Sequence, residues 1–234
     1  MRPLIIGHRG CKGLEPENTL LAIRKAISLN VDAIEIDVRL SKDNELVVIH
    51  DSRVDRTTNG KGHVKNLTLR EIKKLDAGKG ERVPTLQEVI DIIKNKVFLL
   101  IELKTSKTEK KVVDLIRKNK IKRTSFVISF MPELIMNVKR LDRGIKTGIL
   151  FTSRFINPVK KARKTKANLV MPLYKIVNKN FVDRCHKEGI KVFVWNIDNL
   201  KELRAYSKLN LDGIGSNRPD ILVEYFKKNK QIFK

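Results

Sequence analysis

The chain alternates short apolar segments with longer stretches in which apolar residues recur at helical spacing. Short runs rich in β-branched residues predict buried strands, and eight occur, over 4–8, 33–38, 97–104, 125–129, 147–151, 168–171, 190–195 and 212–216. Helical spacing predicts eight helices, over 17–29, 85–94, 109–118, 132–141, 157–165, 178–188, 199–208 and 219–228. We expect the first helix to begin at Glu17, in the start signal Pro16-Glu17-Asn18-Thr19.

This order of elements predicts an α/β fold, a TIM (β/α)8 barrel. The strands are almost entirely apolar, as expected for a parallel sheet that is covered on both faces. Eight strand–helix units in 234 residues match a small barrel. Because no Gly- or Pro-rich linker divides the series, we expect a single domain over 1–234. An open, doubly wound sheet is the alternative that the pattern leaves open.

One segment interrupts the alternation after the second predicted strand. Residues 42–45 are turn-like, residues 46–49 are strand-like, and 51–84 are polar with one short helical patch at 69–75. We interpret 51–84 as an insertion between the second strand and its helix. In TIM barrels such loops lie at the carboxyl ends of the strands, where active sites are found.

Positive charge is unevenly distributed along the chain. Residues 1–102 contain 18 basic and 15 acidic residues, whereas 103–234 contain 32 basic and 11 acidic residues. A basic surface attracts polyanions, anionic lipid or a phosphorylated substrate, although a merely lysine-rich, solvated exterior would give the same count. Because only 6% of the residues are aromatic, we expect no specific nucleic-acid partner. Weak attraction to an anionic membrane surface remains a hypothesis.

The remaining composition indicates a cytoplasmic protein. The first seven residues are apolar over too short a stretch for a secretory signal, and no run of about 18 apolar residues occurs. Two cysteines, Cys11 and Cys185, do not make a disulfide framework. We expect Cys11 to be a neighbour of the site described next and not a nucleophile.

Three carboxylates fall near the carboxyl ends of two predicted strands. Glu35 and Asp37 are two residues apart and therefore face the same side of the second strand, and Glu102 lies on the third. Carboxylates that converge in a buried place repel one another, and a divalent cation would relieve the repulsion. All-oxygen ligands favour Mg²⁺, Ca²⁺ or Mn²⁺. In the alternative interpretation the acids form a structural salt-bridge cluster with Arg9 and Lys104.

Two of the four histidines are predicted to flank these acids. His8 ends the first strand. A hairpin that turns at 42–45 sets Asp37 opposite Ile49 or His50, which brings His50 back to the acids. A pair of histidines beside a bound anion can act as acid and base. His63 and His186 lie in the insertion and on a helix, and we regard them as incidental.

The motifs that carry these residues resemble those of the glycerophosphodiester phosphodiesterase family. They are, in chain order, Gly7-His8-Arg9-Gly10, Pro16-Glu17-Asn18-Thr19, Glu35-Ile36-Asp37-Val38, Lys42-Asp43, Val48-Ile49-His50-Asp51, the segment 56–62, the segment 83–89, and Ile101-Glu102-Leu103-Lys104. The resemblance is specific in residues 5–104 and looser beyond.

The resemblance implies a TIM barrel that hydrolyses glycerophosphodiesters, with a divalent cation, to sn-glycerol 3-phosphate and an alcohol. It implies that His8 and His50 are the acid–base pair. It also implies that Glu35, Asp37 and Glu102 hold the metal and that Arg9 and Lys104 hold the phosphate. We also expect Trp195, at the end of the seventh strand, to contact the substrate. The nucleophile is either water or the glycerol hydroxyl beside the phosphate, and the pattern does not assign acid and base to individual histidines.

Three positions depart from the family pattern. Asn196 follows Trp195 where Thr is usual, Asn217 replaces the usual Asp after the last strand, and Ser41 precedes the Lys-Asp pair where Thr is usual. Asn217 lowers the negative charge near the expected mouth, which could alter the alcohol that is accepted.

Two other functions remain open. A lysophospholipase D-type enzyme would need apolar residues at the mouth, for which the candidates are Phe130, Met131, Phe151 and Phe155. A polyanion-binding barrel without activity is the alternative of another class.

Overall fold

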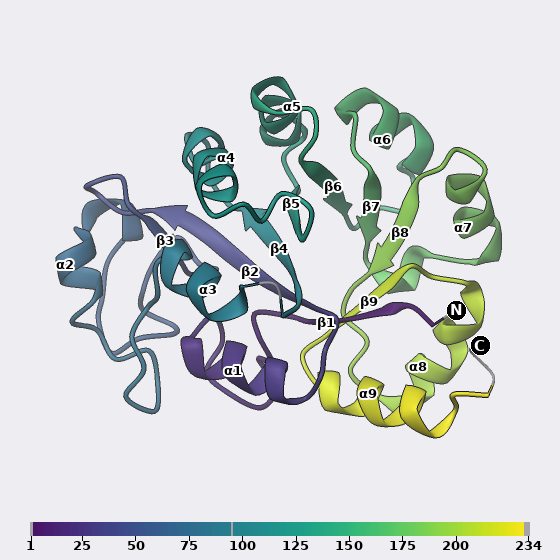
Figure 1. The fold of residues 1–234 in the computed structure, drawn as a ribbon, viewed down its shortest axis with the longest axis horizontal. Coiled ribbons are helices and arrows are strands. Elements are labelled where there is room, and N and C mark those ends of the chain that lie inside the picture. Colours follow the sequence, from purple (N-terminus) through teal and green to yellow (C-terminus); the bar gives the residue numbers. More distant parts are fainter. Residues whose placement is uncertain (1, 95, 232–234) are drawn as a thin grey trace.

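Eight parallel strands close into a barrel in the computed structural model, which describes residues 2–94 and 96–231 (Figure 1). Strand β1 pairs with both β2 and β9, which closes the sheet and excludes an open one. The predicted TIM barrel is confirmed. The barrel strands are β1 (Leu4–Gly7), β2 (Ala33–Leu40), β4 (Phe98–Leu103), β5 (Ser125–Ser129), β6 (Lys146–Phe151), β7 (Leu169–Pro172), β8 (Lys191–Val194) and β9 (Gly213–Ser216).

Helices surround the barrel and bury their apolar faces against its outer side. They are α1 (Leu20–Ser28), α3 (Leu86–Ile93), α4 (Glu109–Lys118), α5 (Pro132–Leu141), α6 (Pro158–Thr165), α7 (Lys179–His186), α8 (Leu200–Tyr206) and α9 (Pro219–Lys228), with 3-10 turns at Tyr174–Ile176 and Ser207–Leu209. Within the described ranges, no helix is both long enough and apolar enough to cross a bilayer.

A second apolar cluster fills the barrel interior at the amino ends of the strands. It includes Ile6, Leu100, Phe126 and Phe193. Ile6 lies two residues before His8 and Leu100 two residues before Glu102, so each pair points to the same side of its strand. The barrel interior is therefore apolar toward the amino ends of the strands and polar at their carboxyl ends, where a substrate could be bound.

The first helix begins at Leu20, so the prediction that it begins at Glu17 is wrong. The Thr19 hydroxyl caps it by accepting from the Ala22 N–H. Asn18 adopts a left-handed backbone with φ 59°, which is incompatible with a helix. Glu17 is consequently free to face Arg9, with the two side chains 2.8 Å apart.

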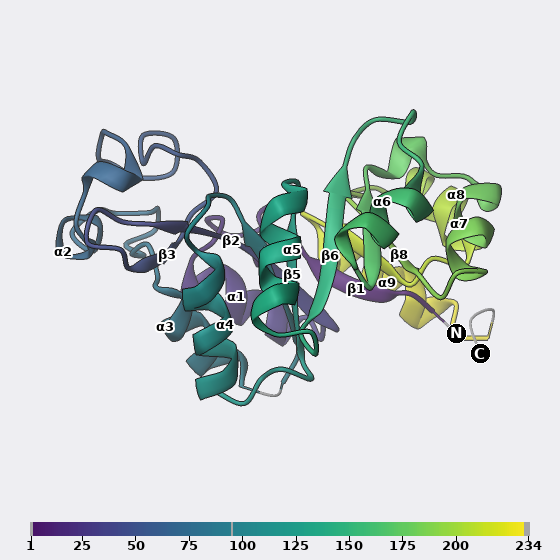
Figure 2. The ribbon, with the colours of Figure 1, turned by 90° about the horizontal axis from the view of Figure 1, so that it is seen from above.

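The segment between β2 and α3 has a small core of its own. It contains β3 (Leu46–Val48), antiparallel to β2, a 3-10 turn at Val64–Asn66 and helix α2 (Leu69–Ile72). The observed strand and helix are shorter than the predicted 46–49 and 69–75. Seven buried residues of this segment pack together: Val47, Ile49, Val54, Val64, Ile72, Ala77 and Val83. In both views β3 and α2 lie at the opposite end of the molecule from α6 and α7 (Figures 1 and 2).

Candidate active site

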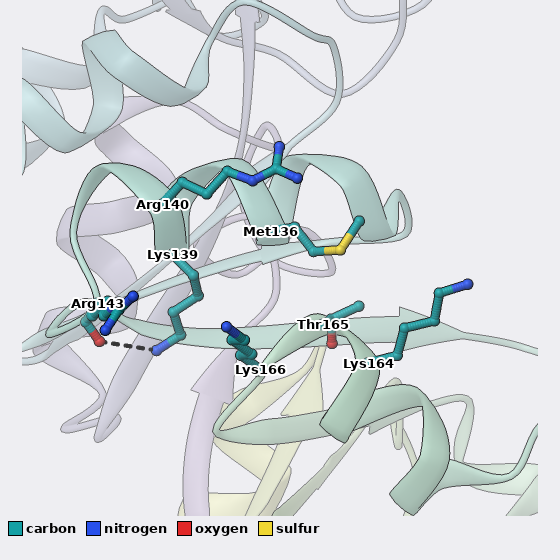
Figure 3. A pocket seen from close by; sticks show the side chains of 7 residues that line it. All are labelled: Met136, Lys139, Arg140, Arg143, Lys164, Thr165 and Lys166. Carbon is teal, nitrogen blue, oxygen red and sulfur yellow. Dashed lines mark hydrogen bonds between the residues drawn. The ribbon is translucent and has the colours of Figure 1, made fainter.

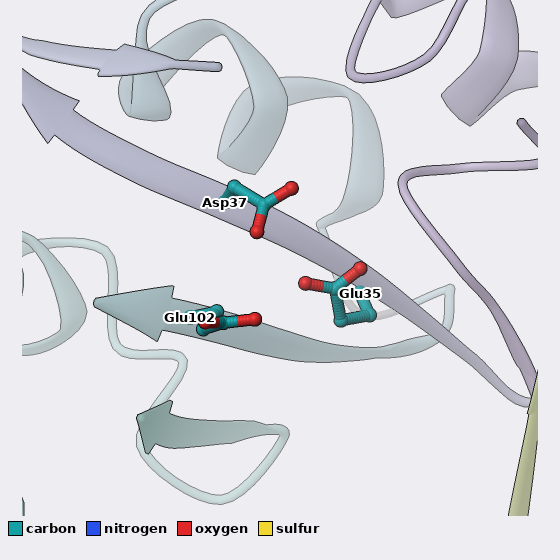
Figure 4. A group of neighbouring side chains, drawn as sticks. All are labelled: Glu35, Asp37 and Glu102. Carbon is teal, nitrogen blue, oxygen red and sulfur yellow. The ribbon is translucent and has the colours of Figure 1, made fainter. Parts of the chain in front are cut away.

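Glu35, Asp37 and Glu102 converge at the carboxyl end of the barrel, from the neighbouring strands β2 and β4 (Figure 4). Asp37 is in register with Glu102, and one carboxylate oxygen of each of the three residues lies within 4.8 Å of the others. All three residues are buried, none more than 6% exposed. The strands thus bring together the three acids that the i, i+2 spacing singled out.

Crowding and burial shift the pKa values of these acids in opposite directions. Burial, together with the charges of Asp37 and Glu102, raises the pKa of Glu35 well above its ordinary value. Burial and Asp37 raise the pKa of Glu102 to about 7. Burial also acts on Asp37, but Lys104, Arg9 and nearby groups outweigh it and lower the pKa. The cluster therefore holds one carboxylate that is stable as an anion and two that need a further positive charge.

The cationic side chains at the site neutralise it only in part. Lys104 Nζ lies 2.7 Å from Glu102 and 3.5 Å from Asp37, and Arg9 Nε lies 3.3 Å from Asp37. Within the described part of the chain, Glu35 has no Lys or Arg side chain within ion-pair distance, and its Oε2 accepts the Arg9 backbone N–H at 2.9 Å. Among the described residues, the buried Glu35 Oε1 and Asp37 Oδ1 receive no hydrogen bond. A salt-bridge cluster leaves these oxygens unsatisfied, whereas a divalent cation fits them.

The backbone of residues 7–10 explains how His8 and Arg9 reach the acids. A Cβ on Gly7 would lie 2.0 Å from the Gly10 carbonyl oxygen, and one on Gly10 would lie 2.8 Å from Ala22. Arg9 and Gly10 both adopt left-handed backbone, with φ 51° and 83°. This tight turn needs glycine at both ends, and it directs the Arg9 N–H at Glu35.

His8 is oriented by a chain of side-chain hydrogen bonds. Its Nδ1 lies 2.7 Å from Asn217 Oδ1, and Asn217 Nδ2 donates to Asp198 Oδ2 at 2.7 Å. Because Asp198 fixes the Asn217 amide, His8 must donate from Nδ1, which leaves a lone pair on Nε2, 3.8 Å from Glu35. Asn196 Nδ2 also lies 3.1 Å from His8 Nδ1, while the Asn196 Oδ1 has no hydrogen-bond donor among the residues that the structure describes. Exchanging the oxygen and nitrogen of this amide would let Oδ1 accept the same Nδ1–H. Burial and Arg9 lower the pKa of His8 to about 4.

His50 follows β3 and has a carboxylate partner. The β2–β3 register sets Asp37 opposite Ile49, whose N–H donates to the Asp37 carbonyl at 3.0 Å. His50 Nδ1 lies 2.6 Å from Asp51 Oδ1, and Arg56 donates to the other Asp51 oxygen at 2.6 Å. Burial lowers the pKa of His50, while Asp37 and Asp51 favour its charged form. The structure thus brings His50 near Asp37, whereas His8 lies near Glu35.

Two site residues escaped the sequence analysis because they were assigned to a helix. Asn18 is buried, donates from Nδ2 to Asp37 Oδ2 at 2.9 Å and accepts the Asp37 N–H. Glu17 accepts from both Arg9 and Arg56; burial opposes the effect, but the two arginines lower its pKa to about 2. Asn217, which the sequence singled out as a departure near the mouth, follows β9 and lies against His8.

Trp195 forms part of the wall of the site. Its indole N–H donates to the Met171 carbonyl at 2.9 Å, and its ring meets Phe130 edge-on with centroids 5.7 Å apart. Trp195 can therefore offer a substrate only its ring surface. Of the four apolar mouth candidates, Phe151 is buried, Phe130 and Met131 are each 38% exposed, and Phe155 is 86% exposed. Cys11 is buried and donates to a backbone carbonyl, as expected for a structural neighbour.

Comparison with known proteins identifies the family. A sequence profile of the glycerophosphoryl diester phosphodiesterase family matches residues 8–221. The chain belongs to this family. Among curated relatives, it is 38% identical over 241 residues to a glycerophosphodiester phosphodiesterase from Caldanaerobacter subterraneus subsp. tengcongensis, covering 97% of this chain and 99% of the relative.

Solved structures of phosphodiesterases share the barrel. A glycerophosphodiester phosphodiesterase from Agrobacterium tumefaciens has a TM-score of 0.86 and 29% identity, covering 96% of this chain and all of the other. An Oleispira antarctica phosphodiesterase, solved in complex with the product sn-glycerol-3-phosphate, has a TM-score of 0.87 and 26% identity, covering 97% of each chain. The predicted family and enzyme class are confirmed.

Proposed function

We propose that this protein hydrolyses glycerophosphodiesters to sn-glycerol 3-phosphate and an alcohol. The observation that carries the proposal is the convergence of three buried carboxylates and two histidines at the carboxyl end of the barrel. The similarity to an Oleispira antarctica phosphodiesterase in complex with sn-glycerol-3-phosphate supports the same product.

Glu35, Asp37 and Glu102 would hold one divalent cation, which fits the two buried oxygens that lack a donor. Oxygen-only ligands suit Mg²⁺, Ca²⁺ or Mn²⁺. When bound, such a cation supplies Lewis-acid stabilisation of the phosphoryl oxygens. Asn18 keeps Asp37 in place for this role, because it bonds both the side chain and the backbone of that residue.

Arg9 and Lys104 would hold the phosphate. Both side chains lie at the edge of the acid cluster, only 10% and 13% exposed, where water competes weakly for their charges. Lys104 also lies over the ring of Phe130, 5.9 Å from its centroid. Together with Trp195, this ring offers an apolar wall to the carbon atoms of the substrate.

His8 and His50 would divide the proton transfers. His8 is held with a lone pair on Nε2, and its low pKa keeps it neutral; it therefore accepts the proton of the attacking hydroxyl. Burial lowers the pKa of His50, but Asp37 and Asp51 favour its imidazolium, so of the two histidines we assign His50 as the one that donates the proton to the departing alkoxide. Proton transfers of this kind typically contribute about 10²–10⁴-fold in rate.

The two alternatives fit the structure less well. A lysophospholipase D-type enzyme needs an apolar ring at the mouth, but Phe130 packs against Trp195, and of the four candidates Phe155 alone is more than half exposed. An inactive polyanion-binding barrel does not need the buried acids and the oriented His8, whose burial is costly without a function. The cytoplasmic location stays a prediction.

A substrate panel tests the proposal. Purified protein would be assayed for release of sn-glycerol 3-phosphate from glycerophosphocholine, glycerophosphoethanolamine and glycerophosphoglycerol, and for release of lysophosphatidic acid and choline from lysophosphatidylcholine, each with Mg²⁺, Ca²⁺ or Mn²⁺. We expect turnover of the water-soluble diesters with at least one ion. Turnover of lysophosphatidylcholine alone would contradict the proposal in favour of the lipid-directed alternative.

A further inference from the structure

The excess positive charge is concentrated at one end of the barrel. Four neighbouring helix-to-strand connections, 117–124, 139–146, 163–168 and 184–191, contain 15 basic and 2 acidic residues among 30. The strand-to-helix connections after β4 to β7, taken like the first set with the adjoining helix residues (104–110, 130–134, 152–160 and 173–181), contain 7 basic and 2 acidic residues among 30. Because the strands are parallel, the first set lies at their amino ends, opposite the acid cluster. We call these four connections the basic end.

Few of these charges are neutralised. Asp142 pairs with Arg117 and Lys122, and Glu188 pairs with Arg163. Six other lysines of the basic end are exposed and make no ion pair with any described residue: Lys118, Lys120, Lys164, Lys166, Lys187 and Lys191.

Neither helix stabilisation nor a general excess of lysine accounts for this distribution. A cation in the last turn of a helix offsets the helix dipole, but the basic end continues into the loops beyond. Lys120 and Lys166 adopt left-handed backbone, with φ 57° and 54°, at positions where glycine or asparagine is preferred. A lysine-rich composition alone would affect both ends of the barrel alike.

Two cationic hollows open on this surface. One, of about 580 Å³, lies between α5 and α6, and Figure 3 shows Arg140, Arg143, Lys164 and Lys166 around it without an acidic side chain. In its wall the buried Lys139 donates to the Ile145 carbonyl at 2.7 Å. The second hollow, of about 610 Å³, lies between α6 and α7 and shares Lys164 with the first.

We propose that the basic end docks on an anionic phospholipid surface. Basic hollows between helices can accept phosphate headgroups, and the lysines around them add long-range attraction to a negative bilayer. The four connections contain no Phe, Tyr or Trp, so the basic end lacks the stacking residues of a single-stranded nucleic-acid site. Their isoleucines, Ile121, Ile145 and Ile190, are buried, and Leu141 is 39% exposed, so docking is mainly electrostatic.

This orientation turns the catalytic mouth away from the bilayer. The docked protein would take its substrate from solution, and binding to a membrane would leave catalysis unchanged. The proposal concerns a surface remote from Glu35 and His8, and it holds or fails independently of the proposed function.

Vesicle sedimentation with two matched variants tests the proposal. The first variant removes four charges from the basic end (Lys118→Gln, Lys120→Gln, Lys164→Gln, Lys166→Gln), and the control removes four exposed lysines from the other end (Lys42→Gln, Lys61→Gln, Lys65→Gln, Lys107→Gln). At low salt we expect the parent and the control to bind phosphatidylglycerol vesicles and not phosphatidylcholine vesicles. The first variant should bind on the order of a thousandfold more weakly. Circular dichroism confirms that each variant is folded.

Three outcomes would overturn the proposal. The parent could fail to bind phosphatidylglycerol vesicles at low salt, the two variants could lose binding equally, or duplex or single-stranded RNA could bind the parent where vesicles do not. Equal loss would mean that net charge, and not the basic end, attracts the surface.

Discussion

The two histidines differ in the groups that hold them, which gives each a separate task. His8 is fixed by the amide of Asn217, whereas His50 is fixed by the carboxylate of Asp51. We predict that His8→Ala and His50→Ala each lower kcat by about 10²–10⁴-fold, as expected for loss of a general base or acid. Thermal unfolding should show both variants folded. His63→Ala, in the insertion, is the control and should retain full activity; retained activity in either test variant would exclude that histidine from catalysis.

The raised pKa of Glu102 predicts a pH-dependent stability. Burial and Asp37 raise the pKa from 4.5 to about 7 in the folded protein. Between these values the unfolded chain releases this proton while the folded protein keeps it, so this carboxyl makes the free energy of unfolding fall as pH rises. Glu102→Gln stays neutral throughout. In EDTA-treated protein we therefore expect the free energy of unfolding of the variant, relative to that of the parent, to rise by about 2–3 kcal/mol from pH 5 to pH 8.

Urea unfolding at several pH values measures this difference, and Glu133→Gln, in the exposed first turn of α5, serves as the control. A stability difference that does not change with pH would show that Glu102 is already ionised at pH 5.

At the scale of elements, the hydrophobic pattern was sufficient to predict the barrel and the hairpin that follows its second strand. Each barrel strand is a buried apolar run, and the turn at 42–45 fixed the register that sets Asp37 opposite Ile49. The start of α1 could not be predicted, because the left-handed backbone of Asn18 depends on its bonds to Asp37 from another element. The hydrogen bonds from Asp198 through Asn217 to His8 likewise join segments far apart in the chain.

The small core of the insertion was also missed, because its apolar residues follow neither helical nor strand spacing. Ile72 is fully buried in that core. We predict that Ile72→Ala destabilises the insertion by about 2–5 kcal/mol and, through the segment that carries His50, lowers activity. Trypsin should cleave the 51–84 segment at least about 30-fold faster, since every 1.4 kcal/mol is tenfold. Leu67→Ala, at the margin of the core, is the milder control, and unchanged cleavage in Ile72→Ala would contradict the interpretation.

At the scale of the whole molecule, charge and chemistry lie at opposite ends of the barrel. The charged groups of the active site are buried beside one another. The exposed lysines of the basic end lie at the opposite end of the barrel, and salt screens their effect on the active site. We therefore predict that kcat/KM for glycerophosphocholine changes less than about threefold between low and moderate salt. Initial rates at several NaCl concentrations measure this; a steep fall would place functional surface charge at the mouth.

The central claim is that three acids hold a catalytic cation, and a metal titration of activity tests it most directly. EDTA-treated parent and Glu35→Gln would be assayed for release of sn-glycerol 3-phosphate from glycerophosphocholine as Mg²⁺, Ca²⁺ or Mn²⁺ is added back. We predict no activity without metal, saturable recovery in the parent, and recovery in the variant only at much higher metal concentration. Full activity of the EDTA-treated parent, or the same metal dependence in both proteins, would contradict the account.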